Sequence, residues 1–183
     1  AHGRIHGGDA EAMSDSAYTA WRTDRNQGLV SVLVAETRED VSALNQRARA
    51  DLILDGTLTP GREVELTDGT AAGVGDTIIT RRNDRRLRNG KNWVRNGDTW
   101  AITGVRDDGS VTIRKTGRRF GGSIVLPAAY VADHADLGYA VTAHRAQGIT
   151  VDTAHVLVEP TTTRENFYVA MTRGRNGNHA YVA

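Results

Sequence analysis

The chain has no cysteine in its 183 residues and only three prolines. Without thiols it can form neither disulfides nor thiolate metal sites, which is compatible with a reducing compartment. No hydrophobic run approaches the roughly 20 residues that a membrane-spanning helix needs, and no signal-peptide core follows the first residues. The histidines are too scattered to predict a metal site. We therefore expect a globular cytoplasmic protein without a membrane segment or a metal centre.

Charge is segregated along the chain, although the net charge is only +1. Residues 1–76 carry seven Lys or Arg against thirteen Asp or Glu, whereas residues 77–119 carry twelve against four. Seven basic residues fall within positions 81–95. One basic segment in a neutral chain favours a local surface for a phosphate backbone. The alternative is a solvated hairpin tip whose charges only aid solubility.

The first 56 residues have the pattern of an α/β fold. Residues 9–25 are predicted to form a helix capped by Asp9, because apolar residues recur there at helical spacing. Residues 30–35 are a short apolar run typical of a buried strand. Thr37 then begins a capping box for a second helix, so the order is helix, strand, helix.

Short alternating runs separated by tight turns follow Pro60 and predict a small β-barrel. After residue 127 the sequence again has the pattern of an α/β fold, with strands predicted at 138–142, 155–158 and 179–182 and a capped helix at 162–172. We therefore expect a β-module at 59–127 inserted into an α/β domain, whose two parts are residues 1–58 and 128–183.

Two stretches hold most of the polar groups that could act on a phosphate. Residues 139–150 form a predicted strand followed by a loop with hydroxyl, imidazole, guanidinium and amide groups. In open α/β sheets, ligands bind at the carboxyl ends of strands. Residues 167–175 end an apolar helix with Arg173 and Arg175 on either side of a glycine. The alternative is that each arginine only interacts with the helix dipole, which is worth about 0.3–1 kcal/mol.

The chain lacks the glycine-rich phosphate loop with its lysine, and no strand ends in an acidic pair that could hold Mg²⁺. A chain without both cannot hydrolyse a nucleotide in the P-loop manner by itself. We therefore expect the isolated chain to have no ATPase activity.

Three sequence motifs resemble those of superfamily 1 helicases. Residues 142–148, Thr-Ala-His-Arg-Ala-Gln-Gly, resemble motif V, and residues 168–175 resemble motif VI with its aromatic-x-A-x-T-R pattern. The Gly-Asp pairs at 75–76 and 97–98 resemble the signature of the SH3-like barrel inserted in RecD-like helicases. The order and spacing are similar to the helicase part of TrwC/TraI-type (MobF) conjugative relaxases of bacteria.

The resemblance implies a RecA-like domain of the P-loop NTPase type that lacks its own P-loop (domain 2A), with an inserted SH3-like β-barrel (2B). A preceding RecA-like domain (1A) of the same polypeptide would carry the phosphate loop and bind most of ATP and Mg²⁺. The implied function is a motor in plasmid transfer that moves along single-stranded DNA, with the conjugation machinery as a further partner.

For the nucleotide, Arg173 matches the arginine finger that acts on the γ-phosphate. A guanidinium offers planar, bidentate stabilisation of phosphoryl charge. Gln147 and Gly148 match the motif V segment that faces the nucleotide. Thr150 stands where several relatives carry a glutamate that contacts the nucleotide sugar, and Arg175 is assigned a supporting role.

For DNA, Thr37, Thr142 and His144 match positions that touch the single-strand backbone, and hydroxyl and imidazole groups suit phosphate oxygens. Thr37 is alternatively an ordinary helix N-cap, and His144 a structural histidine. Trp93 and Trp100 are placed to stack on bases, although core packing is the more common role for Trp100. The expected basic DNA-binding loop comprises Arg81, Arg82, Arg85, Arg86, Arg88, Lys91 and Arg95. The competing function is a non-catalytic nucleic-acid-binding or protein-docking module that uses only this basic segment.

Overall fold

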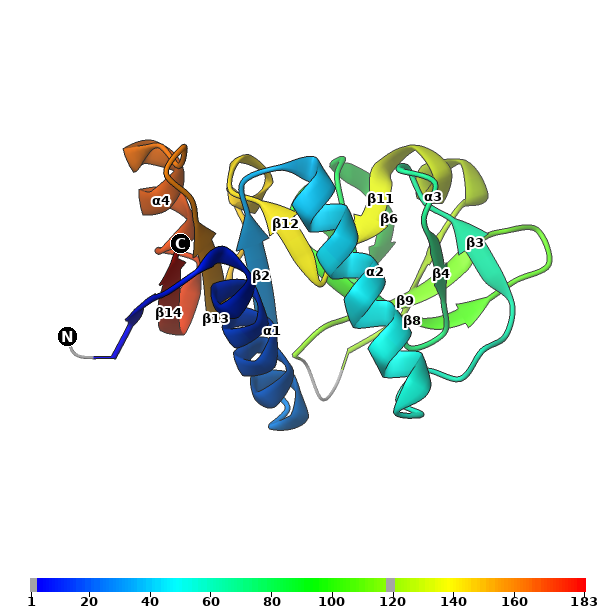
Figure 1. Ribbon diagram of the computed structural model, residues 1–183. Helices are drawn as coiled ribbons and strands as arrows, with labels where there is room; N and C mark the ends of the chain where they lie inside the picture. Colours follow the sequence, from blue (N-terminus) through cyan, green and yellow to red (C-terminus); the bar gives the residue numbers. More distant parts are fainter. Residues whose placement is uncertain (1–2, 118–120) are drawn as a thin grey trace. The chain divides into compact units, whose positions relative to one another are not determined.

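The computed structural model describes residues 3–117 and 121–183 (Figure 1). The chain divides into two compact units, residues 1–44 with 139–183 and residues 45–138. These bounds differ from the predicted 58/59 and 127/128 because the second half of helix α2 (Arg38–Leu54) and helix α3 (Ala128–His134) group with the β-rich unit.

The first unit is built on a parallel sheet of five strands in the order β1-β14-β13-β2-β12. The sheet therefore has one carboxyl edge and one amino edge, where all its strands end and begin. All five residues of β2 are buried, as expected for a central strand of a parallel sheet. The strands are β1 (Ile5–Gly7), β2 (Ser31–Ala35), β12 (Ala140–Thr142), β13 (Val151–Val158) and β14 (Gly174–Val182).

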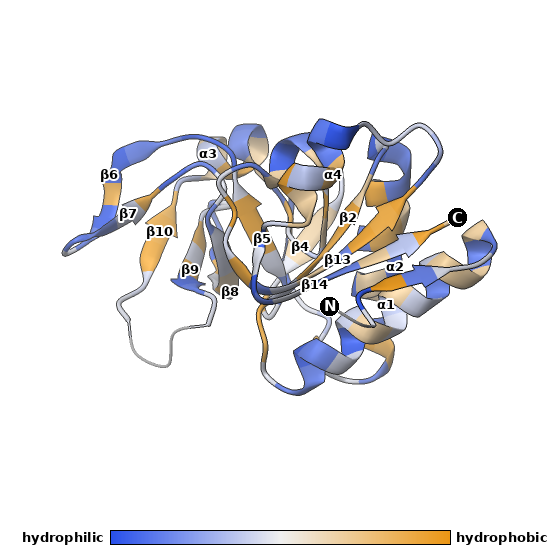
Figure 2. Ribbon diagram, turned by 90° about the vertical axis from the view of Figure 1, so that its left-hand side faces the viewer, coloured by the Kyte–Doolittle hydropathy of each residue, from blue (hydrophilic) through white to orange (hydrophobic). Residues whose placement is uncertain are grey.

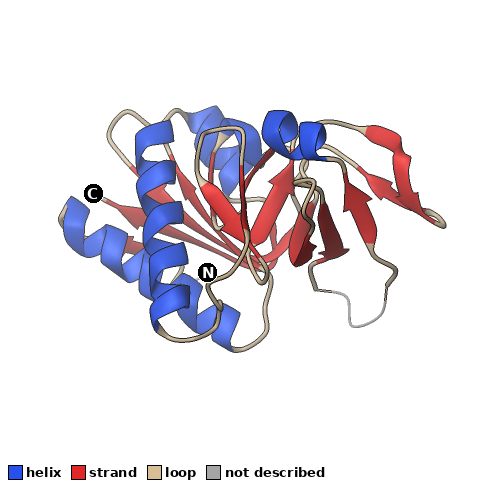
Figure 3. Ribbon diagram, turned by 90° about the vertical axis from the view of Figure 1, so that its right-hand side faces the viewer, coloured by secondary structure: helices blue, strands red, loops and turns tan. Residues whose placement is uncertain are grey.

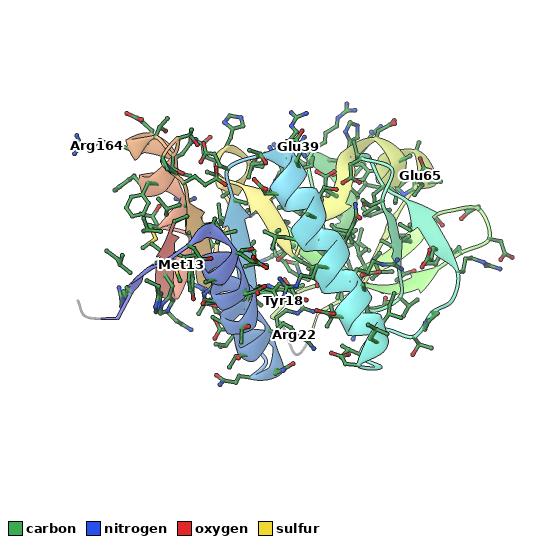
Figure 4. All side chains as sticks on the ribbon, in the orientation of Figure 1. Met13, Tyr18, Arg22, Glu39, Glu65 and Arg164 are labelled. Carbon is green, nitrogen blue, oxygen red and sulfur yellow. The ribbon has the colours of Figure 1, made fainter. Side chains whose placement is uncertain are left out.

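Helix α1 (Ala10–Asn26) packs along β13, β2 and β14. Its buried residues Met13, Ala17, Tyr18 and Trp21 follow the helical period that the sequence predicts (Met13 and Tyr18 are labelled in Figure 4). The Asp9 carboxylate accepts a hydrogen bond from the Ala12 N–H at 2.9 Å, which confirms the predicted cap.

Helix α4 (Arg164–Ala170) is shorter than the predicted 162–172, and its N-cap is Thr163 rather than Thr162. The Thr162 hydroxyl instead accepts from the Glu159 N–H at 3.0 Å and closes the preceding turn. Helix α4 packs against β13 and against the 3₁₀ helix η1 (His144–Ala146).

The second unit is mainly an antiparallel sheet in the order β10-β9-β8-β5-β11 (its first four strands are labelled in Figure 2). Trp100, Ile78, Ile79 and Ile113 are at most 1% exposed and form its core. The predicted antiparallel strands are present, while their closure into an SH3-like barrel stays a prediction. The sheet comprises β5 (Thr77–Thr80), β8 (Thr99–Val105), β9 (Val111–Lys115), β10 (Ile124–Leu126) and β11 (Ala135–Leu137).

Two further strand pairs belong to the second unit, β3 (Glu63–Glu65) with β4 (Ala71–Gly73) and β6 (Asp84–Asn89) with β7 (Asn92–Val94). The β6–β7 hairpin extends beyond the five-stranded sheet and is largely hydrophilic (Figures 2 and 3). The sequence did not predict strands β1, β4, β6, β7 and β11 or helix α3.

Candidate nucleotide and nucleic-acid site

Arg173 follows the last turn of α4, and its side chain folds back onto that turn. The Arg173 Nε donates to the Val169 carbonyl at 2.7 Å, and Nη2 donates to the Thr172 hydroxyl at 2.8 Å. A guanidinium has five N–H groups, so three remain without a partner among the described residues. The side chain is half-buried rather than sequestered. This donor set suits a phosphate oxygen.

The backbone beside Arg173 joins the amino edge of the parallel sheet. The Val151 N–H donates to the Arg173 carbonyl at 3.1 Å, and Val151 is in register with Gly174. Arg173 therefore lies where β13 and β14 begin, next to exposed Thr150. The structure thus brings two of the predicted nucleotide-binding residues to the same edge.

Arg175 lies at this edge but already has a carboxylate partner. Its Nη2 is 3.0 Å from Asp152 Oδ1. The other Asp152 oxygen accepts from the Val30 N–H at 2.8 Å. Arg175 therefore ties β14 to β13, while Asp152 ties β13 to the segment before β2, and the nucleotide contact of Arg175 stays a prediction.

The predicted DNA contacts lie at the opposite, carboxyl edge. Thr142 ends β12 in register with Ala35, the last residue of β2, so Thr37 and His144 both follow strands that end at this edge. Asn166 in α4 donates to Glu36 at 3.1 Å, which places the start of α4 at the same edge. The sequence predicted a carboxyl-end position only for residues 139–150 and placed Arg173 at the end of a helix, so the edge of the sheet at which Arg173 lies is given by the structure.

The hydroxyls at the carboxyl edge are partly occupied. Thr37 is the N-cap of α2, since its oxygen accepts from the Asp40 N–H at 3.1 Å while its hydroxyl donates to the Asp40 carboxylate. The Thr142 hydroxyl accepts from the Arg145 N–H at 3.2 Å. His144 is exposed, and its ring has no hydrogen bond within the described ranges, so the structural role that we considered for it has no support.

Gln147 and Gly148 connect the two edges. Both are exposed, and Gly148 adopts a φ of +82°. No neighbour lies within 4 Å of the position a Gly148 side chain would take. The glycine is therefore required by the turn and not by close packing.

The basic segment is a hairpin and not the expected loop. Gly90, with a φ of +58°, turns the chain between β6 and β7. Arg82, Arg85, Arg88, Lys91 and Arg95 are exposed. This basic surface is available for a polyanion.

Two arginines of the predicted DNA-binding set pair with carboxylates of the protein. Arg81 is paired with Asp136 at 3.0 Å, with side chains only 14% and 12% exposed, so we correct its assignment to a structural ion pair. Arg86 pairs with Asp84 at 3.0 Å but stays largely exposed. Trp100 is 1% exposed and donates to the Thr80 hydroxyl at 3.1 Å, so it is a core residue and not a stacking platform.

The Gly-Asp pairs organise turns within the second unit. Asp76 is 1% exposed and accepts from the Gly73 N–H at 2.8 Å and from Arg49 Nε at 2.9 Å. The Asp98 carboxylate pairs with Lys115 at 3.0 Å. Asp76 therefore closes its turn through the Gly73 N–H and joins it to α2 through Arg49, a partner that the sequence did not indicate.

Sequence reasoning also missed a buried polar cluster in the first unit. His155 is 2% exposed, with Nε2 at 2.7 Å from Asp24 and Nδ1 at 3.0 Å from the Tyr181 hydroxyl. Burial lowers the pKa of His155 and raises the pKa of Tyr181 to about 12. Neutral His155 then donates to Asp24 and accepts from Tyr181, which joins α1 to β13 and β14.

The probable conjugal transfer protein TraA of Sinorhizobium fredii is 31% identical to the chain over 185 residues, covering 99% of the chain and 16% of TraA. This chain is homologous to one segment of the TraA proteins. The resemblance to conjugative proteins that the motifs predict is thereby confirmed. A scan against protein-family models finds no match.

Solved helicase structures share the fold. Pif1 helicase from Bacteroides, in complex with ADP-AlF3 and ssDNA, has a TM-score of 0.56 at 18% identity over 84% of this chain and 41% of that one. Pif1 helicase from Candida albicans has a TM-score of 0.53 at 15% identity over 93% of this chain and 52% of that one. Like TraA, both extend well beyond the matched segment. The α/β fold with its parallel sheet therefore resembles the corresponding part of the Pif1 helicases.

No helix within the described ranges is long and apolar enough to cross a membrane.

Proposed function

We propose that this chain is the second RecA-like domain of an ATP-dependent DNA helicase within a conjugative relaxase. Its second unit corresponds to the inserted SH3-like module. A preceding RecA-like domain of the same polypeptide supplies the phosphate loop and holds ATP and Mg²⁺. The homology to a segment of TraA and the fold shared with Pif1 support this function.

The observation that carries the proposal is the separation of two polar sets on opposite edges of one sheet. Arg173, with three remaining N–H donors, lies at the amino edge, while Thr142 and His144 lie at the carboxyl edge. A nucleotide at one edge and a DNA strand at the other can then be coupled through the same rigid domain. ATP supplies the phosphoryl transfer whose charge Arg173 stabilises.

The test is DNA-stimulated ATP hydrolysis by the full polypeptide that carries this chain. Arg173→Lys keeps the charge but loses the planar fork, and a lost arginine finger costs roughly 10³–10⁵ in rate. The matched control is Arg164→Lys at the other end of α4 (labelled in Figure 4), where hydrolysis stays unchanged.

One result would favour the competing function. If Arg173→Lys hydrolyses ATP at the normal rate and substitutions in the β6–β7 hairpin abolish DNA binding, the chain is a binding module and not part of the motor. The exposed basic side chains of the β6–β7 hairpin are the observation that favours this second function.

A further inference from the structure

Trp93 on β7 lies among cations of the β6–β7 hairpin. The guanidinium carbon of Arg85 is 5.1 Å from the centroid of the Trp93 ring, and that of Arg95 is 4.8 Å away. Both distances are within the range of cation–π attraction. Arg88 is the cross-strand partner of Trp93 and is exposed. One half-buried indole thus gathers basic side chains from β6 and from the residue that follows β7.

The two stacked guanidiniums keep their hydrogen-bonding capacity. Neither Arg85 nor Arg95 pairs with a carboxylate within the described ranges, in contrast to Arg81 and Arg86 on the same segment. Stacking on a ring uses the face of the guanidinium and leaves the N–H groups at its rim. The distances to the shared ring also hold the two guanidinium carbons within about 10 Å of each other.

We propose that Arg85 and Arg95, held by Trp93, form a clamp for neighbouring phosphates of one DNA strand. Trp93 is a positioning residue in this clamp and not a platform for bases, because two cations already occupy its π surface. The clamp reads the backbone alone, so it binds the strand irrespective of base identity. This inference rests on the proposed function, since it identifies how the inserted module holds DNA.

The aromatic ring lowers the cost of binding by ordering two long side chains in advance. A free arginine loses rotamer freedom when it contacts a phosphate, and pre-organisation reduces that loss. Removing the ring therefore weakens the contacts of both arginines at once, although the charge of the hairpin is unchanged.

The experiment measures binding of the 183-residue chain to a fluorescent oligothymidylate and to an abasic strand of the same length, over a series of salt concentrations. Each lost phosphate contact reduces the steepness of the salt dependence by about 0.7 for a single strand. Arg85→Ala and Arg95→Ala are each expected to show that change. Trp93→Ala is expected to reduce the steepness of the salt dependence by nearly twice as much. Its loss of affinity is expected to be equal for oligothymidylate and for the abasic strand. Trp93→Phe is expected to retain most of the binding.

Arg106→Ala, an exposed arginine of the same unit outside the hairpin, is the matched control for charge. The clamp is supported if Arg106→Ala changes the steepness of the salt dependence less than Arg85→Ala does. The inference is overturned if Trp93→Ala weakens binding only to oligothymidylate without altering the salt dependence, since that is base stacking. It is also overturned if none of the hairpin variants differs from the control.

Failure of the clamp is distinguishable from failure of the proposed function. If the hairpin variants bind normally but Arg173→Lys in the full polypeptide still abolishes DNA-stimulated hydrolysis, only the clamp is wrong. If Arg173→Lys has no effect and the hairpin variants lose binding, the clamp holds and the motor role fails.

Discussion

The Val151 N–H donates to the Arg173 carbonyl at 3.1 Å, which joins the segment after motif V to the end of motif VI. Strand β13 and most of α4 lie between the two motifs, yet this bond holds their ends at one edge of the sheet. The position of the Arg173 guanidinium is therefore fixed by the sheet as well as by α4. Strain at this joint would disturb the proposed nucleotide site.

Gly174 provides the first prediction, because it has no room for a side chain. A Cβ at this position would lie 2.0 Å from the Gly177 carbonyl oxygen and 3.0 Å from the Ala154 nitrogen. Gly174→Ala must move the backbone next to Arg173, and overpacking of this kind costs about 1–3 kcal/mol. Urea unfolding of the chain measures the loss.

Gly148→Ala is the matched comparison for Gly174→Ala. Its φ of +82° strains any side chain, but a Cβ there would meet nothing within 4 Å. The expected cost is the conformational one alone, about 1–2 kcal/mol. We expect both variants to have a lower free energy of unfolding than the unaltered chain. The rate of amide exchange of Val151 is expected to rise only in Gly174→Ala. Equal exchange in the two variants would show that the joint tolerates a side chain.

The second prediction concerns the cap of α2. The Asp40 carboxylate accepts a hydrogen bond from the Thr37 hydroxyl and places a negative charge at the carboxyl edge. If Thr37 contacts a DNA phosphate, Asp40→Asn strengthens single-strand binding, because it removes that charge and weakens the competing acceptor. Thr37→Val loses the cap, which costs about 1 kcal/mol of stability, and also weakens binding.

Glu39→Gln is the control for Asp40→Asn, because Glu39 is exposed, adjacent and loses the same charge. Fluorescence anisotropy with single-stranded DNA compares the two. A gain in affinity of the same size in both variants would indicate a general charge effect and would count against a contact by Thr37.

Much of the first unit could be predicted from the sequence, because its signals are local. Asp9 and Thr37 precede apolar residues at helical spacing, and β2 is an uninterrupted apolar run, so caps and periodicity sufficed. The motif VI arginine was likewise visible in its sequence pattern. The edge on which Arg173 lies was not, because that depends on the direction of α4 across the sheet.

The elements that were missed take their stability from distant partners. Strand β6 consists largely of charged residues and is a strand only because β7 pairs with it. Strand β11 is three residues long and pairs with β5, more than 50 positions earlier in the chain. The pairing of Arg81 with Asp136 is equally remote in sequence, so a run of arginines could not reveal which one is structural.

The third prediction is a pH dependence of stability from the buried His155. Its pKa is lowered in the folded state by burial, although the facing Asp24 opposes this; His179, Tyr181 and His6 also face the ring. The folded state therefore binds fewer protons than the unfolded state below the ordinary histidine pKa. The contribution to stability is complete above about pH 6.5 and falls as the pH decreases from there.

Hydrogen exchange of the β13 amides between pH 7.5 and pH 5.5, corrected for the intrinsic rate, follows this loss. His155→Asn is expected to lower protection at pH 7.5 and to flatten its decline with pH. His144→Asn, at an exposed position of the same unit, should leave the decline as it is. A steep decline that persists in His155→Asn would assign the titration to another group.

The central claim is that the Arg173 guanidinium stabilises the charge of a transferring phosphoryl group. Its most direct test is the trapping of ADP with aluminium fluoride by the full polypeptide in the presence of single-stranded DNA. We predict that Arg173→Lys binds ADP as tightly as the unaltered protein but fails to retain it when aluminium fluoride is added, because the planar complex mimics the transition state. Retention of ADP-aluminium fluoride by Arg173→Lys at the unaltered level would contradict the claim.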